Sequence, residues 1–162
     1  MEAKFITLEG IEGSGKTSSI KSITNVLDNK NISYIVTREP GSSSIGRELR
    51  SILLDTKTEI SSEVELMLML ADRKDHVEKV VLPNLTLLFD VPVEISLSRV
   101  KARGELDRFE QEEIDFHNRI REAYLELAEQ NVNRIQIIDS SQAFKDMLKS
   151  VEEKIKNLFF NE

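Results

Sequence analysis

One stretch constrains the fold of this chain more than any other: Gly10-Ile11-Glu12-Gly13-Ser14-Gly15-Lys16-Thr17. It follows the strand-like run Phe5–Leu8 and leads into a segment, Lys16 to about Leu27, whose apolar residues recur at helical spacing. A glycine-rich turn in this position lets successive backbone N–H groups point inward around an anion. The positive end of the helix dipole adds to the attraction. The motif therefore predicts a strand–loop–helix unit that binds phosphate groups.

Strand-like and helix-like segments alternate along the rest of the chain. The run Leu85–Phe89 is continuously apolar, which is typical of a strand buried on both faces of a parallel sheet. We predict strands at 5–8, 33–37, 85–89 and 134–138, and helices at 16–27, 45–54, 63–81, 92–103, 111–130 and 144–159. Asp90 could cap the helix that follows it or act as an indirect partner of Mg²⁺, and we favour the cap. This order predicts one α/β domain over residues 1–162, a three-layer parallel sheet flanked by helices of the P-loop NTPase type.

Composition narrows the class of partner. The 22 Lys and Arg against 29 Asp and Glu give a net charge of −7, which disfavours nonspecific binding to nucleic acid. No apolar run approaches the ~20 residues that a membrane span needs. The chain has no cysteine, which suits a reducing compartment. We therefore expect a cytoplasmic protein with neither a nucleic acid nor a membrane partner.

The same loop predicts how a nucleotide is held. In a P-loop of this form Lys16 reaches the β- and γ-phosphates and the Thr17 hydroxyl binds Mg²⁺, so residues 10–17 are the predicted ATP site. A GTPase would need an Asp-x-x-Gly switch and an Asn-Lys-x-Asp base reader, and the sequence contains neither. ATP with a second, small substrate is the better interpretation at this length.

Further motifs follow in a fixed order. They are Thr37-Arg38-Glu39-Pro40-Gly41, Ala71-Asp72-Arg73, Leu87-Leu88-Phe89-Asp90-Val91-Pro92 and Arg103-Gly104-Glu105-Leu106-Asp107-Arg108-Phe109-Glu110. Together with the P-loop they resemble the bacterial thymidylate kinase family over nearly the whole chain. The resemblance implies phosphoryl transfer from ATP to dTMP, giving dTDP and ADP for dTTP biosynthesis, with Mg²⁺ and as a homodimer. Two alternatives stay open: another small P-loop nucleotide or metabolite kinase, and a nucleotide-binding regulator that has lost catalysis.

The resemblance also implies roles for acceptor-site residues. Glu12 would accept a hydrogen bond from the sugar hydroxyl of dTMP, Arg38 would hold its phosphate, and Arg73 would donate to a thymine carbonyl. Relatives commonly carry a Phe that stacks on thymine four residues before that arginine. Met69 stands there in this chain, and its soft side chain can pack on a ring or belong to the core.

Catalytic charge is expected from a lid near residues 99–112. The P-loop itself holds no basic residue between Gly10 and Gly15, so Arg103 and Arg108 are the predicted sources of positive charge for the transferred phosphoryl group. Gly104 would provide the hinge that a closing lid requires.

One segment of the family pattern is missing near residues 83/84. Relatives carry there a further strand ending in Asp-Arg-Tyr, a glycine-rich loop and a helix, whereas here the helical pattern runs straight into Pro83 and Asn84. Either the protein carries a segment that this sequence omits, or the protein is shortened. We expect the first, because joining neighbouring parallel strands takes a crossover of a dozen or more residues.

Overall fold

The computed structural model describes residues 3–41, 43–76, 83–104, 106–110 and 113–160. They fall into two compact units. The first comprises Met1–Tyr34, Leu82–Gly104 and Glu112–Glu162, and the second comprises Ile35–Val81 and Glu105–Gln111. The prediction of a single domain with a lid stays a prediction, and each unit is described by itself.

The first unit is built on a parallel sheet of three strands in the order β1-β2-β3. The strands are β1 (Ile6–Glu9), β2 (Leu85–Asp90) and β3 (Ile135–Asp139). β2 lies in the centre, where Leu8 pairs with Leu87 on one side and Leu88 with Ile137 on the other. The predicted α/β class with a parallel sheet is confirmed.

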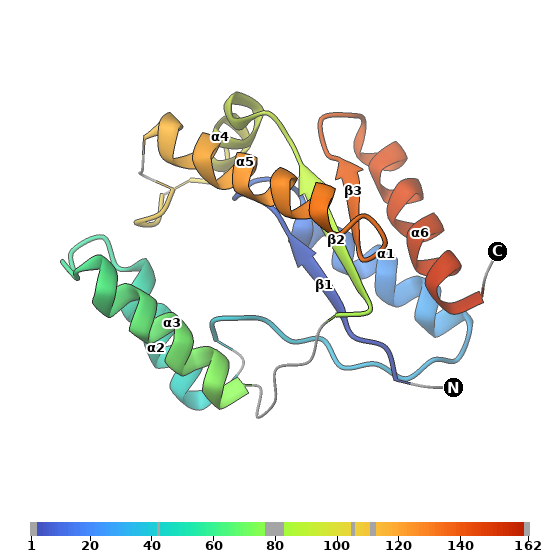
Figure 1. The fold of residues 1–162 in the computed structure, drawn as a ribbon, viewed down its shortest axis with the longest axis horizontal. Coiled ribbons are helices and arrows are strands. Elements are labelled where there is room, and N and C mark those ends of the chain that lie inside the picture. The colour runs from blue at the N-terminus through green and yellow to red at the C-terminus, as the bar shows by residue number, and fades with distance from the viewer. Residues whose placement is uncertain (1–2, 42, 77–82, 105, 111–112, 161–162) are drawn as a thin grey trace. The chain divides into compact units, whose positions relative to one another are not determined.

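Helices cover both faces of this sheet (Figure 1). One face carries α1 (Lys16–Asn29) and α6 (Phe144–Phe160), and the other carries α5 (Ile114–Gln130). The helix α4 (Val93–Lys101) packs against α5 beside the loop that follows β1. The three layers are therefore α1 with α6, the sheet, and α5.

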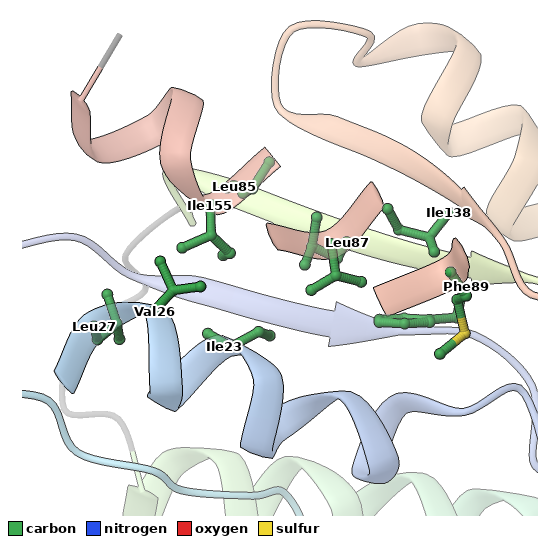
Figure 2. Close-up of a cluster of buried hydrophobic side chains, with 10 residues drawn as sticks. Ile23, Val26, Leu27, Leu85, Leu87, Phe89, Ile138 and Ile155 are labelled. Carbon is green, nitrogen blue, oxygen red and sulfur yellow. The ribbon is translucent and has the colours of Figure 1, made fainter. Parts of the chain in front are cut away.

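The alternation of side chains along β2 explains why this strand reads as uniformly apolar. Leu85, Leu87 and Phe89 point toward α1 and α6, where they join the main core drawn in Figure 2. Leu88 points the other way and packs with Ala128 of α5. Because each face of the strand is covered, both sets of side chains are apolar.

The second unit contains two helices, α2 (Ser44–Leu54) and α3 (Ser62–His76). The Ser43 side chain caps α2 by accepting a hydrogen bond from Gly46 N at 2.8 Å. The predicted helix 63–81 corresponds to α3 as far as His76, and residues 77–82 lie outside the described residues. In the part of the chain that the structure describes, no helix is long and apolar enough to cross a membrane.

The predicted strand at 33–37 is wrong. Residues 32–38 form no strand, and Ile35 is 93% exposed. The pattern of β-branched and aromatic residues is correct for a strand, but a strand also needs a neighbour whose backbone groups pair with its own. In the described residues the sheet ends at β1, and no strand pairs with this segment.

Candidate active site

The loop between β1 and α1 has the geometry of an anion nest. Gly10, Gly13 and Gly15 all have positive φ angles, of 135°, 71° and 98°. A Cβ atom on Gly10 would lie 2.5 Å from the Phe89 carbonyl oxygen, and one on Gly13 would lie 2.7 Å from that of Ser96. Neither position can hold a side chain, so the first and second of these glycines are required both by the turn and by close packing.

Lys16 occupies this loop. Its Nζ atom donates to the carbonyl oxygens of Gly10 at 2.6 Å and of Ile11 at 2.8 Å. Burial lowers the pKa of Lys16 below its ordinary value of 10.5; nearby Glu12 and Glu9 oppose this shift, and Arg103 adds to it. A cation that is partly shielded from water and lies near another cation is strongly stabilised when a phosphate group binds beside it.

Thr17 and Glu12 stand at the open side of the loop. Both residues are exposed, and Thr17 lies in the first turn of α1 directly after Lys16. Among the described residues no group of three or more His, Cys, Asp or Glu side chains could hold a metal ion. The hydroxyl of Thr17 is an oxygen donor of the kind that Mg²⁺ accepts as a ligand.

The two predicted catalytic arginines belong to different units. Arg103 follows α4 in the first unit, and its charge acts on Lys16. Arg108 lies in the second unit, where its side chain donates to the Leu53 carbonyl and to a Glu65 carboxylate oxygen, both at 2.9 Å. The structure thus brings Arg103 to the phosphate loop and engages Arg108 with α2 and α3.

The predicted acceptor residues, Glu12 apart, all lie in the second unit. Arg38 is exposed and precedes the turn at Gly41, whereas Met69 and Arg73 lie one helical turn apart on α3. Met69 is 44% exposed, and the Arg73 side chain lies outside the described residues. Asp72, which is 2% exposed, links these pieces because one of its carboxylate oxygens accepts a hydrogen bond from Gly41 N at 3.2 Å.

Two polar pairs close the carboxyl ends of β1 and β2. Asp90 accepts two hydrogen bonds from Arg121, at 2.6 and 2.9 Å, which raise the pKa of that arginine further. Glu9 accepts a hydrogen bond from the Tyr124 hydroxyl at 3.2 Å. The prediction that Asp90 caps the next helix is wrong: Pro92 occupies the N-cap of α4, and the carboxylate turns to α5 instead.

Three residues lie behind the phosphate loop in positions that sequence analysis did not predict, although Arg99 falls within the predicted lid near residues 99–112. Ser96 and Arg99 of α4, and Ser140 after β3, all donate to carbonyl oxygens of the loop. They are distant from the loop in the sequence, and no local motif marks them. Only the fold brings them to it.

Comparison with known proteins shows which family this chain is similar to. A family model described as thymidylate kinase matches residues 8–83 and 78–151. The chain is 38% identical to a thymidylate kinase of Carboxydothermus hydrogenoformans over 184 residues, covering 86% of this chain and 90% of the relative. It is 33% identical to that of Nitrosospira multiformis over 204 residues, covering 98% and 100%. For the protein of Ligilactobacillus salivarius the identity is 36% over 191 residues, covering 88% and 92%.

These alignments are longer than the chain. The one with the Nitrosospira relative runs over 204 residues, whereas this chain has 162. The relative therefore carries residues that have no counterpart here. The two parts of the family match overlap at residues 78–83.

Proposed function

The chain belongs to the thymidylate kinase family, and on that basis we propose that it transfers the γ-phosphoryl group of ATP to dTMP, giving ADP and dTDP. The observation that carries the proposal is the phosphate loop: three glycines in left-handed conformations followed by a lysine whose charge lies among them. This arrangement suits a nucleoside triphosphate far better than a neutral ligand.

The chemistry is a displacement at phosphorus. An oxygen of the dTMP phosphate forms a bond to the γ-phosphorus of ATP, and the bond from that phosphorus to the oxygen bridging the β- and γ-phosphates breaks. Lys16 and the N–H groups of the loop stabilise the charge that gathers on the leaving phosphate. Arg103, whose charge acts on Lys16, is one proposed catalytic arginine, and Arg108 is the other.

Mg²⁺ is the proposed metal. When bound it would offset the negative charge of the nucleotide phosphates. Thr17 is its proposed protein ligand, because the hydroxyl is exposed next to Lys16 at the N-terminus of α1.

The acceptor site draws on the second unit. We assign the dTMP phosphate to Arg38, the thymine ring to Met69 and Arg73, and the sugar hydroxyl to Glu12. Asp72 supports this assignment, since it precedes Arg73 on α3 and is hydrogen-bonded to the turn that follows Arg38. The compartment we propose for this reaction of ATP and dTMP is the cytoplasm.

We also propose that two copies of the chain associate through α3. This helix exposes Leu66, Met67 and Leu70, which are 57%, 67% and 56% exposed. A cluster of large apolar side chains on one helix is typical of a surface that another protein covers.

An acceptor panel tests the proposed activity. The purified chain is incubated with ATP and Mg²⁺ and with dTMP, dUMP, UMP, CMP or AMP in turn, and ADP formation is followed. dTMP should be the preferred acceptor, and chelation of Mg²⁺ should stop the reaction. Preference for another acceptor would favour a different small kinase. Binding of ADP without turnover of any acceptor would favour a regulator that has lost catalysis.

A further inference from the structure

Three successive carbonyl groups of the phosphate loop each receive a side-chain donor from outside the loop. Ser96 Oγ donates to the Glu12 carbonyl, Arg99 Nη1 donates to that of Gly13 at 3.5 Å, and Ser140 Oγ donates to that of Ser14 at 2.5 Å. Two of the donors come from α4 and the third from the turn after β3.

The direction of these carbonyls matters for anion binding. A peptide plane carries its C=O and N–H groups on opposite edges, so a carbonyl that is held on the outer side of the loop turns the N–H of the same plane inward. The donors to Glu12, Gly13 and Ser14 therefore act on the planes whose N–H groups belong to Gly13, Ser14 and Gly15. Ser14 N donates to the Ile11 carbonyl at 3.3 Å, so the N–H groups of Gly13 and Gly15 are the ones we assign to the phosphate nest.

The donors are themselves fixed. Ser96 and Ser140 are 2% and 1% exposed, so water does not compete for the hydrogen bonds they make. Arg99 Nη2 also donates to the Ser140 carbonyl at 2.9 Å, and Ser140 N donates to the Asp90 carbonyl at 2.8 Å. The set is thereby joined to the end of the central strand β2.

We propose that Ser96, Arg99 and Ser140 are positioning residues for ATP, which act by holding the phosphate loop in its anion-binding conformation. Without one of these donors a loop carbonyl loses its side-chain partner, and the loop gains other conformations. The choice of ATP as ligand rests on the proposed function, whereas the effect on nucleotide binding does not require turnover.

Two serine-to-alanine variants test the proposal, with a matched control on the same helix. Ser96→Ala and Ser140→Ala remove one buried donor each, and Ser98→Ala removes an exposed hydroxyl two residues from Ser96. ADP affinity is measured by calorimetric titration, thermal unfolding by circular dichroism without nucleotide, and KM for ATP and for dTMP by steady-state assay.

Each test variant should bind ADP about tenfold more weakly and show a matching rise in KM for ATP, as the loss of a hydrogen bond to a buried group implies. KM for dTMP should stay unchanged, and Ser98→Ala should behave as wild type. Variants that melt at lower temperature but, when folded, bind ADP within about twofold of wild type would overturn the proposal, because the bonds would then contribute to stability alone. If the wild type binds ADP but turns over no dTMP, the proposed function fails while this inference is still decided by the ADP titration.

Discussion

At the scale of single residues, the phosphate loop concentrates its chemistry in Lys16. The ammonium group is buried against two carbonyls and lies within the field of Arg103. No other described residue combines a charge, burial and a place in the loop in this way. Single-residue changes at Lys16 therefore report directly on the nucleotide.

Lys16→Ala should lower kcat for dTMP phosphorylation by at least about 100-fold, because the charge that stabilises the leaving phosphate is lost. The fold should persist, since the side chain bonds only to loop carbonyls. Lys21→Ala, at an exposed position of α1, is the control and should retain activity. Turnover within a few-fold of wild type in Lys16→Ala would show that the loop does not act on the transferred phosphate.

Nucleotide affinity should fall as the pH rises toward the Lys16 pKa, which burial has lowered from its ordinary value. A bound phosphate favours the charged ammonium, so loss of its proton weakens binding; burial has lowered the pKa at which that loss occurs. Titrations with ADP from neutral to alkaline pH measure the effect. The Lys16→Ala protein should lack this alkaline decline, and an identical decline in both proteins would assign it to another group.

Sequence alone predicted the part of the candidate site that is local in the chain. Lys16 and Thr17 follow from the spacing of the loop, because the chemistry of the motif depends on adjacent residues. Ser96, Arg99 and Ser140 do not, because serine and arginine at those positions form no pattern until the fold places them behind the loop. The sequence did not predict the pairing of Asp90 with Arg121, because Arg121 lies on a helix that is distant in the sequence.

At the scale of secondary-structure elements, a buried carboxylate links α3 to the turn after Arg38. Asp72 approaches both Gly41 and the start of α2, where a Cβ atom on Gly46 would lie 2.3 Å from its Oδ1 atom. The glycine at position 46 is thus fixed by the space that Asp72 needs. The three pieces form one compact arrangement within the second unit.

Asp72→Ala should raise KM for dTMP by about tenfold and leave KM for ATP unchanged, because the turn that carries Arg38 loses a buried hydrogen bond. Asp72→Asn keeps an oxygen acceptor and should give an intermediate value. Glu63→Ala, exposed on the same helix, is the control. Equal changes in both KM values would argue against a role confined to the acceptor side.

Periodicity predicted the helices well and one strand badly. Helices satisfy their backbone groups internally, so the pattern of 16–27 or 144–159 is enough to identify α1 and α6. The segment 33–37 has a strand pattern but finds no partner in the described residues. A pattern of side chains carries no information about which neighbour is present.

At the scale of the whole molecule, we expect two copies of the 18.5 kDa chain to associate in solution. Light scattering coupled to size exclusion should report a dimer, and Met67→Glu combined with Leu70→Glu should give a monomer, because charged groups oppose burial of the α3 surface. Lys21→Glu on α1 is the control for added negative charge. A wild-type protein that is monomeric at all concentrations tested would contradict the proposal.

A second prediction concerns the residues that relatives carry and this chain lacks. We propose that they belong near Pro83 and Asn84, because the two parts of the family match overlap at residues 78–83. Inserting the corresponding segment of the Carboxydothermus relative at this junction should raise the melting temperature and kcat for dTMP together. A scrambled insert of equal length is the control. No gain over the control would indicate that the chain works in its short form.

The two hydrogen bonds that Lys16 donates also lower the affinity of the loop for every ligand. The ammonium donates to the carbonyls of Gly10 and Ile11, and a phosphate in the loop would compete with these carbonyls for its protons. The loop carbonyls therefore compete with a phosphate for the Lys16 ammonium, and they do so at high local concentration because they belong to the same chain. The observed affinity for a phosphate is lower than the intrinsic affinity to the extent that Lys16 stays hydrogen-bonded to these carbonyls. The attraction between a phosphorylated ligand and the Lys16 ammonium offsets the free energy of breaking these hydrogen bonds, whereas a nucleoside without phosphates offers no such attraction. The loop should therefore bind nucleotides in preference to uncharged nucleosides.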